Sequence, residues 1–209
     1  SFLNVVVYRL PREESLAFPP SHCPKCDHHI KPWENIPLVS YLFLGGKCSA
    51  CKTTIAWRYP LVEGLTGIVF YLAYLEFGFT WDLPVFALFG ALLIAIAFID
   101  IDHMIIPDSM IIIGLIPGFY ILWSESGHFL TSQIYGLIGL GLLFWAIRFF
   151  GEKAFKKEAM GFGDVKFAAM AGWVLGWEVG IVSMFLAFLS ATLLFTILIP
   201  TGVISRKQQ

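Results

Sequence analysis

Long apolar runs separated by short polar segments make up most of this chain after residue 59. Six runs have the character of membrane-crossing helices: 60–78, 84–99, 105–124, 134–150, 165–177 and 180–200. Most approach the ~20 residues that a helix needs to cross about 30 Å of hydrocarbon. Residues 1–10 resemble the end of a further membrane helix and are too short to span by themselves. The pattern predicts an all-α, polytopic membrane protein.

The fifth run is unusually short. Residues 165–177 would form a helix only about 20 Å long, which is less than the hydrocarbon thickness. Gly161 and Gly163 lie immediately before it. Irregular backbone at membrane depth is tolerated where it is buried in protein or lines a wet cavity. We therefore expect an aqueous pocket around Asp164.

The charges support a membrane protein and give its orientation. Charged residues are 14% of the chain and apolar residues 57%, whereas soluble domains are about 25% charged. With six spans, all 14 Lys and Arg residues fall on one side of the membrane. Cytoplasmic loops are enriched in these residues, so the cationic side is expected to face the cytoplasm. A water-soluble helical bundle would not produce this segregation.

The spans also divide the chain. Residues 1–10 are expected to end a first helix, 11–59 to form a cytoplasmic loop, 60–205 to form a six-helix membrane core, and 206–209 to form a cytoplasmic tail. The loop has about 50 residues, which is too few to build a strong hydrophobic core alone. It therefore needs a covalent or metal cross-link.

Four cysteines in this loop provide a candidate cross-link. Cys23 and Cys26 form one C-x2-C pair, and Cys48 and Cys51 form a second. Paired C-x2-C motifs predict a tetrahedral structural zinc site. Two disulfides or redox cycling are the weaker alternative, because the cytoplasm is reducing. A catalytic metal is disfavoured because four thiolates leave no open position for water. We interpret the neighbouring histidines, 28 and 29, as solvated loop residues.

Two aspartates at the ends of apolar runs are the candidate catalytic groups. Asp100 closes the second run and Asp164 precedes the fifth. Ionisable groups at membrane depth are costly and usually functional. Two carboxylates close enough to share one proton can perform aspartic-protease chemistry, one as general base and one as acid. The predicted activity is therefore that of a membrane aspartic endopeptidase.

Simpler roles remain open for the polar residues. Asp164 could act only as a helix N-cap, and Asp100 only as a boundary charge. Asp102 and Asp108 are interpreted as solvated or turn-forming, and His103 as an interfacial polar residue. The chain has no G-x-S-x-G or H-E-x-x-H motif that would indicate another hydrolase. The alternatives are an ion- or proton-coupled transporter that uses the buried aspartates, and a non-catalytic scaffold that docks through the zinc loop.

Several motifs together resemble one known family. They are the two cysteine pairs, Ser1-Phe2-Leu3-Asn4-Val5-Val6, Arg9-Leu10-Pro11, Asn35-Ile36-Pro37, Arg58-Tyr59-Pro60-Leu61-Val62-Glu63, the stretch 100–108, and Gly161-Phe162-Gly163-Asp164. This set resembles the bacterial type IV prepilin peptidases, the bifunctional leader peptidase/N-methyltransferases of pilus and type II secretion systems. The G-x-G-D tetrapeptide alone also occurs in presenilin-like and preflagellin peptidases. Full-length members have further helices at both ends, so we expect this chain to be trimmed.

The resemblance implies a specific reaction. Members remove the basic leader of a prepilin or pseudopilin at the cytoplasmic edge of the bacterial inner membrane and then methylate the new N-terminus with S-adenosylmethionine. Their catalytic pair corresponds here to Asp100 and Asp164, with Asp102 ranked second. The methyl-donor site cannot be assigned, although Glu63 and the cysteine loop are candidates to assist it. No nucleic-acid partner is expected, and the substrate's identity and the oligomeric state remain open.

Overall fold

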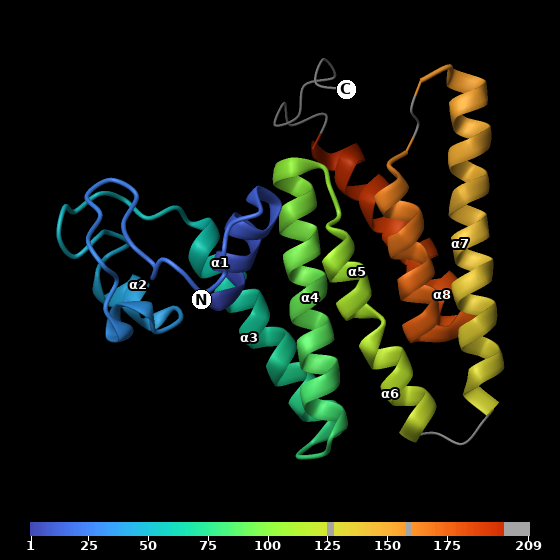
Figure 1. The fold of residues 1–209 in the computed structure, drawn as a ribbon, viewed down its shortest axis with the longest axis horizontal. Helices are drawn as coiled ribbons and strands as arrows, with labels where there is room; N and C mark the ends of the chain where they lie inside the picture. The colour runs from blue at the N-terminus through green and yellow to red at the C-terminus, as the bar shows by residue number, and fades with distance from the viewer. Residues whose placement is uncertain (125–127, 158–159, 199–209) are drawn as a thin grey trace. The chain divides into compact units, whose positions relative to one another are not determined.

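The structure is a computed structural model that describes residues 1–124, 128–157 and 160–198 (Figure 1). Within these residues the regular structure is helical, apart from two isolated β-bridges. The predicted all-α fold is confirmed. The chain divides into two compact units, Ser1–Pro117 and Gly118–Gln209, which are described separately below.

The first unit opens with a short helix and the cysteine loop. Its elements are α1 (Phe2–Arg9), the 3-10 turn η1 (Leu10–Arg12), the 3-10 turn η2 (Pro32–Asn35) and α2 (Val39–Phe43). The buried guanidinium of Arg9 donates hydrogen bonds to the carbonyl oxygens of Ser15, at 2.9 Å, and Pro19, at 2.7 Å. The start of the cysteine loop is thereby attached to the end of α1.

Two long apolar helices follow, α3 (Arg58–Phe77) and α4 (Asp82–His103). The turn between them begins at Gly78, whose φ is 57°. Glycine adopts this positive φ at little energetic cost because it has no Cβ. A Cβ on Gly90 of α4 would overlap the Val69 side chain of α3, so the glycine permits close helix packing. Val62, Ala95 and Ile99 are fully buried in this unit.

The third apolar run folds as two shorter helices, α5 (Asp108–Gly114) and α6 (Ile116–Ser124). The sequence predicted one continuous span over residues 105–124. Pro117 has no backbone N–H to donate, and its ring conflicts with the carbonyl four residues earlier. The helix is consequently interrupted at Leu115, and the boundary between the two units falls within α6.

The second unit is built mainly from α7 (His128–Phe155) and α8 (Phe162–Leu198). A Cβ on Gly136 of α7 would overlap the carbonyl oxygen of Gly172 in α8, and the reverse also holds. The two backbones therefore touch, as small residues allow in membrane helix pairs. Leu140, Phe144, Val165 and Ala168 form a buried cluster between these helices.

A break divides α8 at Gly176, which has φ 74° and ψ 176°. The backbone N–H of Trp177, just past the break, donates to the Ser132 hydroxyl at 3.2 Å. The helix before the break, residues 162–175, is about 21 Å long at ~1.5 Å per residue. The break thus lies next to the predicted end of the short fifth run.

Four described helices are long and apolar enough to cross a membrane: Arg58–Phe77, Asp82–His103, Leu130–Ala154 and Phe162–Leu193. The stretch Asp108–Ser124 is apolar but shorter. Many large apolar side chains on these helices are exposed, as expected for residues that face lipid rather than water. The protein is a multi-pass membrane protein, as predicted.

Candidate active site and metal centre

The four cysteines lie on two turns with the same local structure. An isolated bridge between His22 and His29 encloses the first C-x2-C pair, and one between Lys47 and Thr54 encloses the second. In both turns the N–H of the first cysteine bonds to a carbonyl five residues later, and the residue after the second cysteine has positive φ. The equal spacing of the two pairs therefore produces two equivalent turns.

The sulfur atoms of the two turns converge. Cys23 Sγ lies 3.8 Å from Cys51 Sγ, and Cys26 Sγ lies 4.0 Å from Cys48 Sγ. All four sulfurs lie within 4.8 Å of one another. A tetrahedral zinc ion with bonds of about 2.3 Å would separate its sulfur ligands by about 3.8 Å. The donor set fits a tetrahedral metal ion, and all four thiols are free of disulfides.

Crowding gives the thiols different acidities. The N–H of Lys25 is the main group that lowers the pKa of Cys23, to about 7. The N–H of His28 acts to lower the pKa of Cys26, but the thiol of Cys51, together with burial, raises it to about 12. Adjacent thiols therefore cannot all ionise easily without a cation between them.

A polar network joins the two cysteine turns to η2. His28 Nε2 lies 3.1 Å from the Ser49 hydroxyl and 3.3 Å from Glu34 Oε2. The N–H of Lys31 donates to the same Glu34 oxygen at 3.0 Å. The N–H of Lys31, and after it the Ser49 hydroxyl and His28, lower the pKa of Glu34. The sequence interpretation of His28 as a solvated residue missed this contact, because residues 28 and 49 meet only after both turns form.

Asp100 lies in the last turn of α4, in the first unit. Its carbonyl oxygen accepts the capping N–H of Met104 at 2.8 Å, and the residue is exposed. Asp102 lies half a turn further along and is bound by Arg58, which also donates to the Phe98 carbonyl at 3.3 Å. The carboxylate of Asp102 is therefore engaged with the first turn of α3, whereas that of Asp100 has no ion pair among the described residues of its own unit.

Asp164 lies in the first turn of α8, in the second unit, and is half-buried. A Cβ on Gly161 would lie 3.4 Å from Asp164 Oδ2, in ordinary van der Waals contact, so the Gly161 backbone lies beside this carboxylate. The following residue, Val165, packs in the buried cluster against α7. Asp164 is thus next in sequence to a residue of the buried core. Because the two aspartates belong to different units, their pairing stays a prediction.

The remaining predicted polar residues have simpler positions. Asp108 opens α5 immediately after Pro107, which is the helix-entrance position expected from the sequence. His103 is the last residue of α4 and is half-buried. The ammonium of Lys166 lies 5.2 Å from the centre of the Phe162 ring, and the Arg148 guanidinium lies 5.4 Å from the same ring. Both cations therefore lie beside the first residue of α8.

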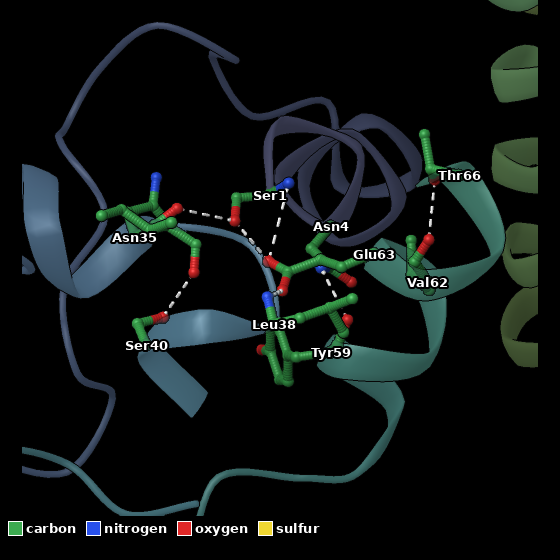
Figure 2. Close-up of polar contacts among 10 residues, drawn as sticks. Ser1, Asn4, Asn35, Leu38, Ser40, Tyr59, Val62, Glu63 and Thr66 are labelled. Carbon is green, nitrogen blue, oxygen red and sulfur yellow. Dashed lines mark hydrogen bonds and ion pairs between the residues drawn. The ribbon is translucent and has the colours of Figure 1, made fainter. Parts of the chain in front are cut away.

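Glu63 connects three segments that are distant in the sequence (Figure 2). Its carboxylate accepts hydrogen bonds from the hydroxyl of Ser1 and, at 2.9 Å, from the N–H of Leu38. The Ser1 hydroxyl also lies 3.0 Å from the Asn35 carbonyl oxygen. Asn4 adds a bond from its side-chain amide to the Tyr59 carbonyl, at 3.3 Å. Two of the motifs singled out in the sequence, those of Ser1 and Glu63, therefore meet at this carboxylate, and the Asn35 motif is joined to them through Ser1 and Leu38.

Comparisons with known proteins agree with these observations. Residues 1–77 match the bacterial peptidase A24 N-terminal domain, and residues 87–197 match the type IV leader peptidase family. A prepilin leader peptidase/N-methyltransferase from Pseudomonas aeruginosa is 37% identical, with 95% of this chain and 77% of that protein covered. No solved structure shows a significant match.

Two further relatives carry related names. A prepilin leader peptidase/N-methyltransferase from Myxococcus xanthus is 37% identical, with 97% of this chain and 61% of that protein covered. A type 4 prepilin-like proteins leader peptide-processing enzyme from Escherichia coli is 39% identical, with 83% of this chain and 72% of that protein covered. The chain belongs to the type IV leader peptidase family, and the resemblance noted in the sequence is confirmed.

Proposed function

We propose that this protein is an aspartic endopeptidase that removes the leader peptide of type IV prepilins or pseudopilins. The observation that carries the proposal is the match of residues 87–197 to the leader peptidase family, with Asp100 and Asp164 at the ends of apolar helices inside the matched region. The names of the relatives support the same activity.

In the proposed reaction the two carboxylates share one proton. The ionised carboxylate accepts a proton from a water molecule, whose oxygen attacks the scissile carbonyl carbon. The protonated carboxylate donates a hydrogen bond to the carbonyl oxygen and stabilises the developing negative charge. When the tetrahedral intermediate collapses, the C–N bond breaks, and the amine leaves with the proton that the first carboxylate took from water. Asp102 is less suited to this role because Arg58 already binds its carboxylate.

Cleavage is proposed to occur at the cytoplasmic face of the bacterial inner membrane. Asp100 and Asp164 lie near the ends of membrane-length helices that the distribution of Lys and Arg assigns to the cytoplasm. A prepilin has its cleavage site between a basic leader and an apolar helix, so that site would lie at the same boundary. The proposed catalytic aspartates and the cleavage site of the proposed substrate would therefore lie at the same depth in the membrane.

The four cysteines are proposed to hold one structural zinc ion, with Cys23, Cys26, Cys48 and Cys51 as ligands. The near-tetrahedral spacing of their sulfurs supports this assignment. Such an ion, bound by four thiolates, would stabilise the fold of the loop without taking part in hydrolysis.

The names of the relatives also support N-methylation of the new N-terminal residue, with S-adenosylmethionine as the proposed donor. In this second step a methyl group would move to the amine that hydrolysis releases. No residue of this chain is assigned to the donor. The site of methyl transfer is therefore proposed only as a property of the whole enzyme.

Reconstitution with a prepilin tests the proposal. The purified protein, in vesicles that contain a prepilin, should release the leader, and mass spectrometry should find a methylated new N-terminus when the donor is added. Asp100→Asn and Asp164→Asn should each stop cleavage. Asp82→Asn, the same change at the other end of α4, is the matched control. Cleavage that survives Asp164→Asn would refute the proposed pair.

A further inference from the structure

The segment between the two cysteine pairs presents apolar side chains to the outside. Trp33 is 64% exposed, Leu42 77% and Phe43 88%. Beside them is an open hollow of about 350 Å³ with five apolar lining residues, Trp33, Ile36, Val39, Phe43 and Leu44. In water, so many exposed apolar groups in one short segment mark a contact surface. We call residues 32–46 the apolar segment.

The apolar segment carries few groups that would be costly to place in lipid. From residue 35 to residue 46 the sequence contains no charged side chain. The Ser40 hydroxyl donates to the Ile36 carbonyl at 2.8 Å. Backbone N–H groups along α2 and the turn after it also have acceptors, at Leu38, Val39, Ser40, Leu42, Leu44, Gly45 and Gly46. An unbonded backbone group costs several kcal/mol in hydrocarbon, so this bonding matters.

Glu63 fixes the apolar segment at the entrance of a membrane helix. Leu38, at the start of α2, donates its N–H to Glu63, which lies in the second turn of α3 (Figure 2). A Cβ on Gly64 would lie 3.9 Å from the Leu38 side chain, so the backbone of α3 is also close. Because α3 is long and apolar enough to cross a membrane from Arg58 onward, a segment attached to its second turn would lie at the depth where the bilayer begins.

The edge of the apolar segment has the chemistry of a membrane interface. The ammonium of Lys31 lies 5.4 Å from the centre of the Trp33 ring. Tryptophan and lysine are favoured at the boundary between headgroups and acyl chains, where an apolar ring and a cation are both satisfied. A cation here also attracts the anionic lipids of the cytoplasmic leaflet.

From these observations we infer that the apolar segment inserts into the cytoplasmic leaflet of the bilayer, with Leu42 and Phe43 among the acyl chains and Lys31 at the headgroups. It would lie in the interface and not span it. The loop that carries the cysteines would then be held against the membrane surface at two points, by insertion of α2 and by the bond to Glu63.

Lipid fits this surface better than a protein partner does. Leu42 and Phe43 project outward, and a fluid bilayer accommodates protruding side chains without a shaped counterpart. The proposed prepilin substrate has a basic leader, and the one acidic group of the segment, Glu34, is already bonded by the N–H of Lys31 and by His28. The inference itself does not depend on the peptidase reaction, because none of the contacts that carry it involves the proposed catalytic aspartates.

Photocrosslinking in vesicles tests the inference. The photoreactive residue p-benzoylphenylalanine would replace Phe43 in the full chain, in vesicles of phosphatidylethanolamine and phosphatidylglycerol. A second variant would carry it at Leu42, and a control at Lys25, an exposed residue in the first cysteine turn. After irradiation, mass spectrometry would identify phospholipid adducts on each labelled peptide. The bound zinc of each variant would verify that the loop is folded.

We expect phospholipid adducts at positions 42 and 43 and none at position 25, whether or not a prepilin is present in the vesicles. Absence of lipid adducts at 42 and 43 in zinc-loaded protein would overturn the inference. Replacement of the lipid adducts by prepilin adducts would overturn it as well, and would assign the surface to a protein partner. Equal labelling at all three positions would show that the adducts do not report insertion, and would also count against it.

Discussion

The carboxylate of Glu63 accepts the backbone N–H of Leu38 at 2.9 Å, across 25 positions of sequence. Leu38 has a φ of 60°, which is unfavourable for a residue with a branched side chain and must be held by its surroundings. A charged acceptor on a membrane helix thus holds a strained turn of the cysteine loop. This contact links the two parts of the first unit that the sequence treats as separate domains.

Removing this acceptor should loosen the loop. Glu63→Ala leaves the N–H of Leu38 without its acceptor, and a hydrogen bond to a charged group contributes about 1.5–3 kcal/mol. We expect faster amide exchange at residues 36–44 and faster proteolysis of the loop, while helical content is unchanged. Glu63→Gln keeps an acceptor oxygen, so its exchange and proteolysis rates should lie between those of the parent protein and Glu63→Ala. Equal exchange rates in Glu63→Ala and the parent protein would contradict the anchoring role.

The cysteine cluster should bind about one metal ion per chain. Cys23→Ser and Cys48→Ser each remove one of four thiolates, so both variants should lose zinc and become protease-sensitive within the loop. Elemental analysis of purified protein measures the first effect, and mapped proteolysis the second. His29→Ala, a change at an exposed neighbour, should keep its zinc. Full zinc content in Cys48→Ser would exclude a four-thiolate site.

The network around Glu34 should make loop stability depend on pH. Its pKa is lowered in the folded protein from an ordinary value of 4.5, chiefly by the N–H of Lys31. Between the lowered pKa and pH 4.5, the unfolded loop therefore binds more protons than the folded loop. The contribution of ionised Glu34 to the stability of the loop is fully present above pH 4.5 and is lost as the pH falls through the lowered pKa. Amide exchange in the loop, compared between the parent and Glu34→Gln, should converge at acid pH. If the difference in exchange rate between the two proteins grew as the pH fell, the predicted direction of the pH dependence would be wrong.

The two aspartates at the end of α4 should behave differently. Asp100→Asn removes a proposed proton-transfer group, which typically lowers a rate by about 10²–10⁴-fold. Asp102→Asn breaks a half-exposed pair with Arg58, and such pairs contribute only about 0–1 kcal/mol. We expect Asp102→Asn to retain most cleavage in the prepilin assay. If both variants lost comparable cleavage activity, the assignment of proton transfer to Asp100 and of a structural ion pair to Asp102 would be wrong.

Helix packing in the second unit should depend on Gly172. A Cβ there would overlap the carbonyl of Gly136, and overpacking a close contact costs about 1–3 kcal/mol. Gly172→Ala should therefore lower the midpoint of thermal unfolding in detergent. Gly67→Ala is the matched control, because nothing lies within 4 Å of its added Cβ in α3. Alanine is the better helix former, so the control should be neutral or slightly stabilising.

Much of the protein could be predicted from residue patterns alone. The apolar runs identified the membrane class, since burial in lipid requires about 20 apolar residues whatever their neighbours are. The C-x2-C spacing predicted the candidate metal ligands, because the two cysteines of each pair lie on one turn; the two turns meet only in the folded loop. The third span was predicted as one helix and folds as α5 and α6, although Pro117 was a visible signal.

Contacts between distant segments could not be predicted in the same way. The bonds of His28 to Ser49, of Arg58 to Asp102 and of Glu63 to Leu38 each join residues whose separation in sequence carries no information about distance. Whether a carboxylate is paired with a cation or left available for chemistry depends on which helices pack together. Sequence by itself determined the class of protein, the candidate metal ligands and the candidate aspartates, since these follow from composition and local spacing. Only the tertiary structure decided which of these side chains have partners, because electrostatic and hydrogen-bond energies depend on distances that chain folding creates.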